Sequence, residues 1–302
     1  MPAVTANGIT IEYDIHGDED APPMLLVMGL GGQLVQWTLP FVEQLADRGF
    51  RVIRFDNRDI GLSSRINAPA PTRRQILAAI ASKRYAKSAY TLADMADDTA
   101  GLLDAIGVEQ AHVVGVSMGG MISQSLTIRH PRRVASLTSI MSNTGDRRHG
   151  RVHRSLLRKA PRYMTLDPAN RVENGMEMFR LISGPHFDAS AVRAMLEEAS
   201  ARSDDLEGAA RQTLAILASP DRTWDLRRVQ APTLVVHGLL DRLVMPSGGI
   251  ATARAIPGSR LVMYPDMGHD LPEVRWGELM EEIVLNTRRA QGGSASQPAK
   301  IA

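Results

Sequence analysis

The stretch Val113-Val114-Gly115-Val116-Ser117-Met118-Gly119 decides the fold. It places a G-x-S-x-G motif directly after an apolar, strand-like run and directly before a helix expected from Met118 to about His130. In that context the serine stands on a sharp strand-to-helix turn, which exposes its hydroxyl at the carboxyl end of the strand. Ser117 is therefore the candidate nucleophile. A glycine-rich turn without chemistry is the alternative interpretation of the same motif.

Strand and helix patterns alternate on both sides of this motif. Asn7-Gly8 predicts an N-terminal hairpin, because this dipeptide favours the tight turn between antiparallel strands. Thr91 and Asp94 predict a capping box at the start of a further helix. The alternation predicts an α/β fold with a mostly parallel central sheet and helices on both faces. The strands expected after the hairpin are short apolar runs at 24–28, 50–55, around 113–114, 134–140, 233–237 and 260–264.

The segment 142–228 breaks this alternation. It contains helical periods but no strand-like run, which predicts a helical lid inserted into the core. Residues 1–141 and 229–290 would form the core, with a final helix ending near Arg289. Residues 291–302 are rich in Gly, Ser and Ala, so we expect a disordered tail there.

A serine hydroxyl needs a base to remove its proton, and the base needs a carboxylate to orient it. His269 follows the last expected strand, at the sheet edge where open α/β folds bind ligands. Asp241 follows the preceding strand, so the chain order is nucleophile, acid, base. Asp146 is the rival acid, and Asp266 and Asp270 are expected at the surface. The other histidines are interpreted as structural or as parts of the insertion: His16, His112, His130, His149, His153, His186 and His237.

Acyl transfer also needs two backbone amides that stabilise the developing oxyanion. Met118 supplies one candidate, at the start of its helix. The glycine-rich loop Met28-Gly29-Leu30-Gly31-Gly32 follows a buried strand and supplies the other, for which we choose Leu30. A turn without this role is the alternative for that loop.

Composition excludes several classes of site. The chain has 302 residues and no cysteine, which excludes disulfides, zinc–thiolate sites and cysteine nucleophiles. Its 35 basic and 33 acidic residues give a net charge of +2, too small to indicate a nucleic-acid-binding protein. No signal peptide or transmembrane segment is visible, so we expect a soluble, cytoplasmic protein. We expect no metal and no cofactor, and the sequence leaves the oligomeric state open.

The motifs, taken in order, resemble those of the α/β-hydrolase superfamily from about Thr10 to Arg289. Met28-Gly29 stands where many members have His-Gly, and the segment Phe55–Ser63 follows as Phe-Asp-Asn-Arg-Asp-Ile-Gly-Leu-Ser. This sequence pattern is similar to that of actinobacterial carboxylesterases related to aclacinomycin methylesterase, and to that of mycobacterial lipase/esterase proteins. The resemblance implies a serine esterase, since the epoxide hydrolases and haloalkane dehalogenases of this fold have an aspartate at the elbow.

Methionine is frequent near the proposed catalytic loops, and its flexible side chain suits a pocket for varied apolar groups. Core packing is the equally weighted alternative. Insertion helices carrying Met164, Met176 and Met195 would add to such a pocket. The pocket residues that we predict are Met28, Trp37, Met121, Met245 and Met267.

Two basic segments could surround the mouth of the site and contact anionic lipid, although charge runs usually face solvent. They are 147–162 and the group Arg73, Arg74, Lys83, Arg84 and Lys87. We therefore predict a serine carboxylesterase that cleaves small to medium apolar esters through an acyl-enzyme. The alternatives are a lipase, phospholipase or thioesterase acting on longer acyl chains, a carbon–carbon bond hydrolase or acyl transferase, and a hydrolase-fold protein that binds a ligand without turnover.

Overall fold

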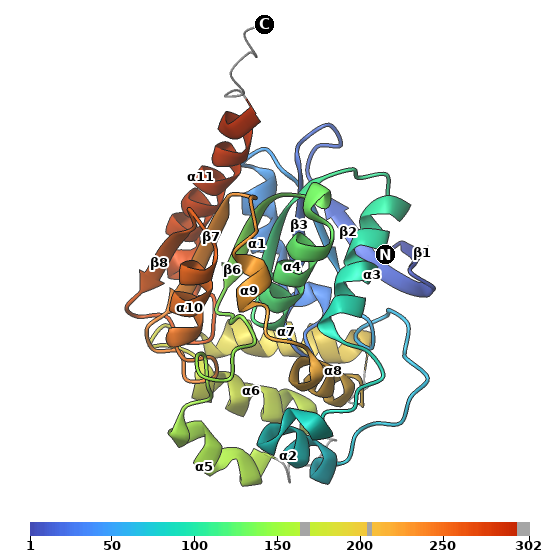
Figure 1. The fold of residues 1–302 in the computed structure, drawn as a ribbon, viewed down its shortest axis with the longest axis vertical. Coiled ribbons are helices and arrows are strands. Elements are labelled where there is room, and N and C mark those ends of the chain that lie inside the picture. Colours follow the sequence, from blue (N-terminus) through green and yellow to red (C-terminus); the bar gives the residue numbers. More distant parts are fainter. Residues whose placement is uncertain (164–169, 204–206, 295–302) are drawn as a thin grey trace, which may run out of the picture.

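Eight strands form one sheet in the order β1-β2-β4-β3-β5-β6-β7-β8 (Figure 1). The computed structural model describes residues 1–163, 170–203 and 207–294. β1 and β2 pair antiparallel with each other, and β2 pairs antiparallel with β4. All the remaining neighbours pair parallel, as expected for this fold class. The strands are β1 (Ala3–Ala6), β2 (Ile9–His16), β3 (Pro23–Val27), β4 (Arg51–Phe55), β5 (Ala111–Val116), β6 (Val134–Ile140), β7 (Thr233–Gly238) and β8 (Arg260–Tyr264).

The hairpin and the capping box predicted from sequence are confirmed. Asn7 and Gly8 both have positive φ, 49° and 77°, as the two-residue turn requires. The Thr91 hydroxyl and the Asp94 carboxylate cap the start of α3 (Leu92–Ala105). The central strands are apolar because both faces of the sheet are covered, and every residue of β5 and β7 is buried.

Helices cover the two faces of the sheet. α3 and α4 (Met118–Arg129) pack on one face, where Leu103 and Ile122 join the same apolar cluster as Val113. α1 (Leu39–Ala46) and α11 (Trp276–Ser294) pack on the other, where Phe41 and Ile283 join a second cluster. α10 (Ser247–Ala255) lies against β7 and β8. α11 continues past Arg289 to Ser294, so the first residues of the expected tail are helical, and 295–302 lie outside the described residues.

Between β6 and β7 the described residues form helices and loops and no strand. The described helices of this segment are α5 (Arg154–Tyr163), α6 (Arg171–Ile182), α7 (Ala189–Arg202), α8 (Glu207–Ala218) and α9 (Thr223–Leu226). Figure 1 shows α5–α8 below the sheet, together with α2 (Arg73–Ala81), while α9 lies beside α4. We refer to α5–α8 as the lid. No helix in the described part of the chain is long and apolar enough to cross a bilayer.

Candidate active site

Ser117 lies on a strained turn between β5 and α4. Its φ of 56° and ψ of −118° belong to a region that residues other than glycine rarely occupy. The Ser117 amide donates to the Ile140 carbonyl across the neighbouring strand, at 2.9 Å. A Cβ on Gly115 would lie 2.3 Å from the Gly119 carbonyl oxygen, and a Cβ on Gly119 would lie 2.0 Å from that of Val27. The motif therefore needs glycine at both positions.

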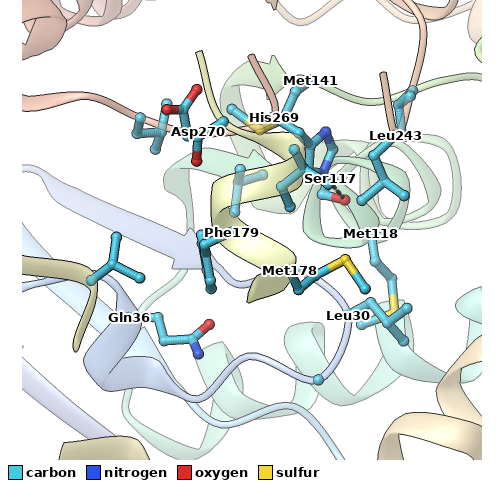
Figure 2. Close-up of a pocket in the computed structure, with 18 of the residues that line it drawn as sticks. Leu30, Gln36, Ser117, Met118, Met141, Met178, Phe179, Leu243, His269 and Asp270 are labelled. Atoms are coloured by element: carbon cyan, nitrogen blue, oxygen red, sulfur yellow. Dashed lines mark hydrogen bonds between the residues drawn. The ribbon is translucent and has the colours of Figure 1, made fainter. Parts of the chain in front are cut away.

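Three side chains from three separate loops form one hydrogen-bonded chain. His269 Nε2 lies 2.9 Å from Ser117 Oγ, and His269 Nδ1 lies 2.7 Å from Asp241 Oδ2. Figure 2 shows His269 and Ser117 joined in this way. If Nδ1–H donates to the carboxylate, the lone pair of Nε2 can accept the serine proton. The three residues follow β5, β7 and β8, whose carboxyl ends lie at one edge of the sheet.

Asp241 is held from several directions. The Leu243 and Val244 amides donate to its Oδ1 at 2.9 and 2.8 Å. His237 Nε2 lies 3.3 Å from its Oδ2 and 2.7 Å from the Val244 carbonyl. Burial alone would raise the pKa of Asp241, but the charge on His269 and the bonds from both histidines lower it to about 2. The carboxylate is therefore ionised and ordered. His237, interpreted from sequence as structural, contacts this acid directly.

The other candidate acids lie elsewhere. Asp146 Oδ2 is 2.6 Å from His149 Nδ1, so it is engaged away from His269. Asp266 forms an ion pair with Arg275, and its Oδ2 lies 2.7 Å from His186 Nε2. Asp270 differs from the expected surface position, because it is partly buried on a cavity wall, where the Gly184 and Gly268 amides donate to it. Burial raises the pKa of Asp270.

The loop after β3 passes beside the serine. A Cβ on Gly29 would lie 3.3 Å from Ser117 Cβ. The Gly32 amide donates to the Gly29 carbonyl at 3.2 Å, and Gly31 has a φ of 70°. These features define a type II turn with Leu30 and Gly31 at its centre. Met118 is the first residue of α4, so its amide has no partner within the helix. Leu30 and Met118 line one cavity with Ser117 (Figure 2).

That cavity has a volume of about 2170 Å³ and lies between the sheet edge and the lid. Of the five predicted pocket residues, Trp37 and Met121 line it. Met28 and Met267 pack instead in the apolar core, and Met245 lines a separate small hollow beside Asp241. A residue's closeness in sequence to a catalytic loop does not determine whether its side chain faces the cavity or the apolar core.

Methionines other than those predicted line the cavity wall. Met141, just after β6, was missed, although its position at the carboxyl end of a strand was a usable signal. Met178 was missed because its helical spacing does not distinguish a cavity residue from a core residue; it projects from α6 into the cavity (Figure 2). Met195 lines the cavity, Met176 is buried away from it, and Met164 lies outside the described residues.

Part of the basic segments reaches the cavity. Lys83, Arg147 and Arg151 line its wall. Lys83 Nζ donates to the Ser219 carbonyl at 2.7 Å, and burial lowers the pKa of Lys83. The Arg147 guanidinium donates to the Ile80 carbonyl. In the described part of the chain, no group of three histidine, aspartate or glutamate side chains is arranged to hold a metal ion.

The chain is similar to known hydrolases over most of its length. Rhodomycin D methylesterase DnrP of Streptomyces peucetius is 28% identical over 308 aligned positions, which cover 95% of this chain and 98% of the relative. A thermophilic esterase from Thermogutta terrifontis superposes with a TM-score of 0.70 at 26% identity, covering 96% of this chain and 99% of its own. The enol-lactonase of Burkholderia xenovorans LB400, 24% identical with a TM-score of 0.69 over 95% of this chain and 100% of its own, shares the fold.

These relatives support a hydrolase of esterase type. The model of the alpha/beta hydrolase fold family matches residues 22–275, which is most of the chain and includes all three residues of the hydrogen-bonded chain. The protein therefore belongs to the α/β-hydrolase fold family.

Proposed function

We propose that this protein is a serine carboxylesterase that cleaves apolar carboxylic esters through an acyl-enzyme. The observation that carries the proposal is the chain Asp241–His269–Ser117, with contacts of 2.7 and 2.9 Å, in which Ser117 and His269 line a large cavity. This arrangement supplies a nucleophile, a base and an orienting anion in mutual contact.

The reaction would proceed in two halves. Ser117 Oγ attacks the ester carbonyl while His269 Nε2 takes its proton, and the Leu30 and Met118 amides donate to the oxyanion. His269 then gives that proton to the departing alkoxide, which leaves as the alcohol and yields the acyl-serine. A water molecule, deprotonated by the same imidazole, hydrolyses the acyl-enzyme and restores Ser117. Each oxyanion donor would contribute about 3 kcal/mol to the lowering of the barrier.

The cavity favours bulky substrates over the small to medium esters expected from sequence. Its volume of about 2170 Å³ exceeds the roughly 300–1,000 Å³ of pockets for drug-sized ligands. Met121, Met178 and Phe179 contribute adaptable apolar wall. A methylesterase of rhodomycin D among the relatives is consistent with a small alcohol leaving from a large acyl group. We therefore place esters with a bulky apolar acyl part first.

A second candidate is a lipase or phospholipase activity at an anionic lipid surface. Arg147 and Arg151 line the cavity beside Ile80, Val152 and Leu157, which are 51%, 36% and 55% exposed. Apolar side chains flanked by guanidinium groups suit the boundary between lipid headgroups and acyl chains.

The test is hydrolysis of p-nitrophenyl esters from acetate to palmitate and of methyl esters of polycyclic acids, with Ser117→Ala in parallel. We expect turnover that disappears in Ser117→Ala and higher kcat/KM for the polycyclic methyl esters. A maximum at palmitate that is enhanced by anionic micelles would support the second candidate.

Labelling by a fluorophosphonate separates these esterases from a protein that only binds a ligand. An activated Ser117 reacts with the probe and Ser117→Ala does not. If the wild-type protein shows no turnover and is not labelled by the probe, the proposal is contradicted.

A further inference from the structure

Gln212 is a fully buried lid residue that connects two loops of the core. It lies on α8, and its exposed fraction is 0%. Its Oε1 accepts a hydrogen bond of 2.9 Å from the Gly31 amide, and its Nε2 donates one of 2.9 Å to the Arg58 carbonyl. Both polar groups of the side chain are therefore used, one on the loop after β3 and one on the loop after β4.

The Gly31 amide is the part of the turn that most needs an external partner. Gly31 follows Leu30, and the peptide between them is the central peptide of the turn Gly29–Gly32. Type I and type II turns differ mainly by a rotation of this central peptide by about 180°. The bond between Gly29 and Gly32 is common to both types, so it does not select one. The bond from Gly31 to Gln212 does select the orientation observed here.

The helix that carries Gln212 is firmly seated on the core. A Cβ on Gly208 would lie 1.8 Å from the Asp59 carbonyl oxygen, so the helix backbone directly contacts the loop after β4. Arg211 binds both oxygens of Asp59, at 2.9 and 3.0 Å. Gly31 packs against Ala209, since a Cβ on Gly31 would lie 3.4 Å from Ala209 Cβ. The position of Gln212 relative to the turn is thus fixed by the contacts of the residues that precede it in α8.

We propose that Gln212 is a positioning residue for the oxyanion site: it holds the turn in the conformation that presents the Leu30 amide. The inference rests on the proposed function, because the Leu30 amide acts only if an oxyanion forms at Ser117. It makes the lid part of the catalytic machinery as well as a wall of the cavity. The amide of Leu30 belongs to the peptide next to the one that Gln212 holds, so a rotation of the central peptide changes the backbone at Leu30.

The test compares Gln212→Met, Gln212→Glu and wild type with the best ester of the panel. Gln212→Met keeps the length of the side chain and removes both hydrogen bonds, while Gln212→Glu keeps an acceptor for the Gly31 amide. We expect kcat to fall at least about tenfold in Gln212→Met with KM within about twofold, and a smaller loss in Gln212→Glu. The affinity for a boronic acid that forms a tetrahedral adduct on the serine should fall in parallel with kcat.

Asn286→Leu is the matched control, because it also removes a buried amide. Asn286 lies on α11, 1% exposed, and donates to the Leu137 carbonyl at 3.0 Å, in a part of the fold that does not line the cavity. We expect it to lower the melting temperature without changing kcat or boronate affinity. Unchanged kcat and boronate affinity in Gln212→Met, with lower stability alone, would overturn the proposal. Failure of the proposed function is distinguishable, because the wild-type protein itself would then lack turnover.

Discussion

Ser117 combines a reactive position with an unfavourable backbone conformation. A non-glycine residue in such a region costs on the order of 1–3 kcal/mol, and the surrounding strands and helix hold it there. The Ile140 carbonyl accepts from the Ser117 amide, and Gly115 and Gly119 leave room for close backbone contacts. The nucleophile is exposed at the cost of local stability.

The cost can be measured at this residue. Ser117→Gly should raise the free energy of unfolding by about 1 kcal/mol relative to Ser117→Ala, because only glycine adopts this φ and ψ without strain. Both variants should lose hydrolysis, so activity is not the discriminating measurement. Urea unfolding of the two variants gives the difference, and equal stabilities would show that the turn is relaxed.

The residues that sequence could predict were those that immediately follow strands. Ser117, Asp241 and His269 each come within a few positions of the end of β5, β7 or β8, and parallel strands bring such positions to one edge. Gln212 and His237 gave no such signal. Gln212 acts through a loop 181 positions away in the chain, and His237 looks like any histidine at the end of a buried strand.

At the scale of elements, α7 and α8 are attached to the core through buried polar contacts. Arg202, at the end of α7, pairs with the fully buried Asp56 at 3.0 Å. Gln33 Nε2 donates to the Ala199 carbonyl at 2.7 Å. Arg211 on α8 binds Asp59 with both partners buried. The alternation of strand and helix patterns predicted the core. The sequence of an all-helical insertion contains no comparable pattern, so it does not show where the helices attach to the core.

The contribution of α8 can be tested at this ion pair. Arg211→Met should lower the free energy of unfolding by about 3–5 kcal/mol, because it leaves the Asp59 carboxylate buried without its cation. Adding Asp59→Asn should recover part of that loss, since an amide avoids the buried charge and tolerates the positive φ of 73° at this position. Chemical unfolding of the single and double variants measures both terms. A loss below about 1 kcal/mol in Arg211→Met would contradict a buried pair.

At the scale of the whole molecule, charge is distributed unevenly although the net charge is only +2. Among the described residues, the lysine and arginine side chains on the cavity wall are Lys83, Arg147 and Arg151. The same wall carries the exposed apolar residues Ile80 and Leu157, and the Arg147 guanidinium donates to the Ile80 carbonyl. The same wall also carries the acidic residues Asp146, Asp188, Glu198, Asp270 and Glu273, so any attraction for anions is confined to the neighbourhood of the basic residues.

Reversal of this charge tests the lipid candidate. Arg147→Glu combined with Arg151→Glu should weaken binding to phosphatidylserine-containing vesicles, with about 1 kcal/mol lost for each basic residue removed near the surface. Arg73→Glu combined with Arg74→Glu makes the same change on exposed residues of α2 that do not line the cavity. Vesicle sedimentation at low and high salt compares the two pairs. If both double variants and the wild-type protein bind the vesicles equally, Arg147 and Arg151 have no role in lipid binding.

The insertion between β6 and β7 has a consequence for how this enzyme can change. The chain leaves β6 at Ile140 and returns at Thr233 to a strand that pairs parallel with it. Parallel neighbours always require a crossover of a dozen or more residues, and the sheet places no demand on its content beyond this return. Mutation can therefore lengthen, shorten or replace the lid over the cavity while Ser117, Asp241 and His269 keep their relative positions. Gln212 limits that freedom, since any replacement lid must still supply a side chain that bonds Gly31 and Arg58.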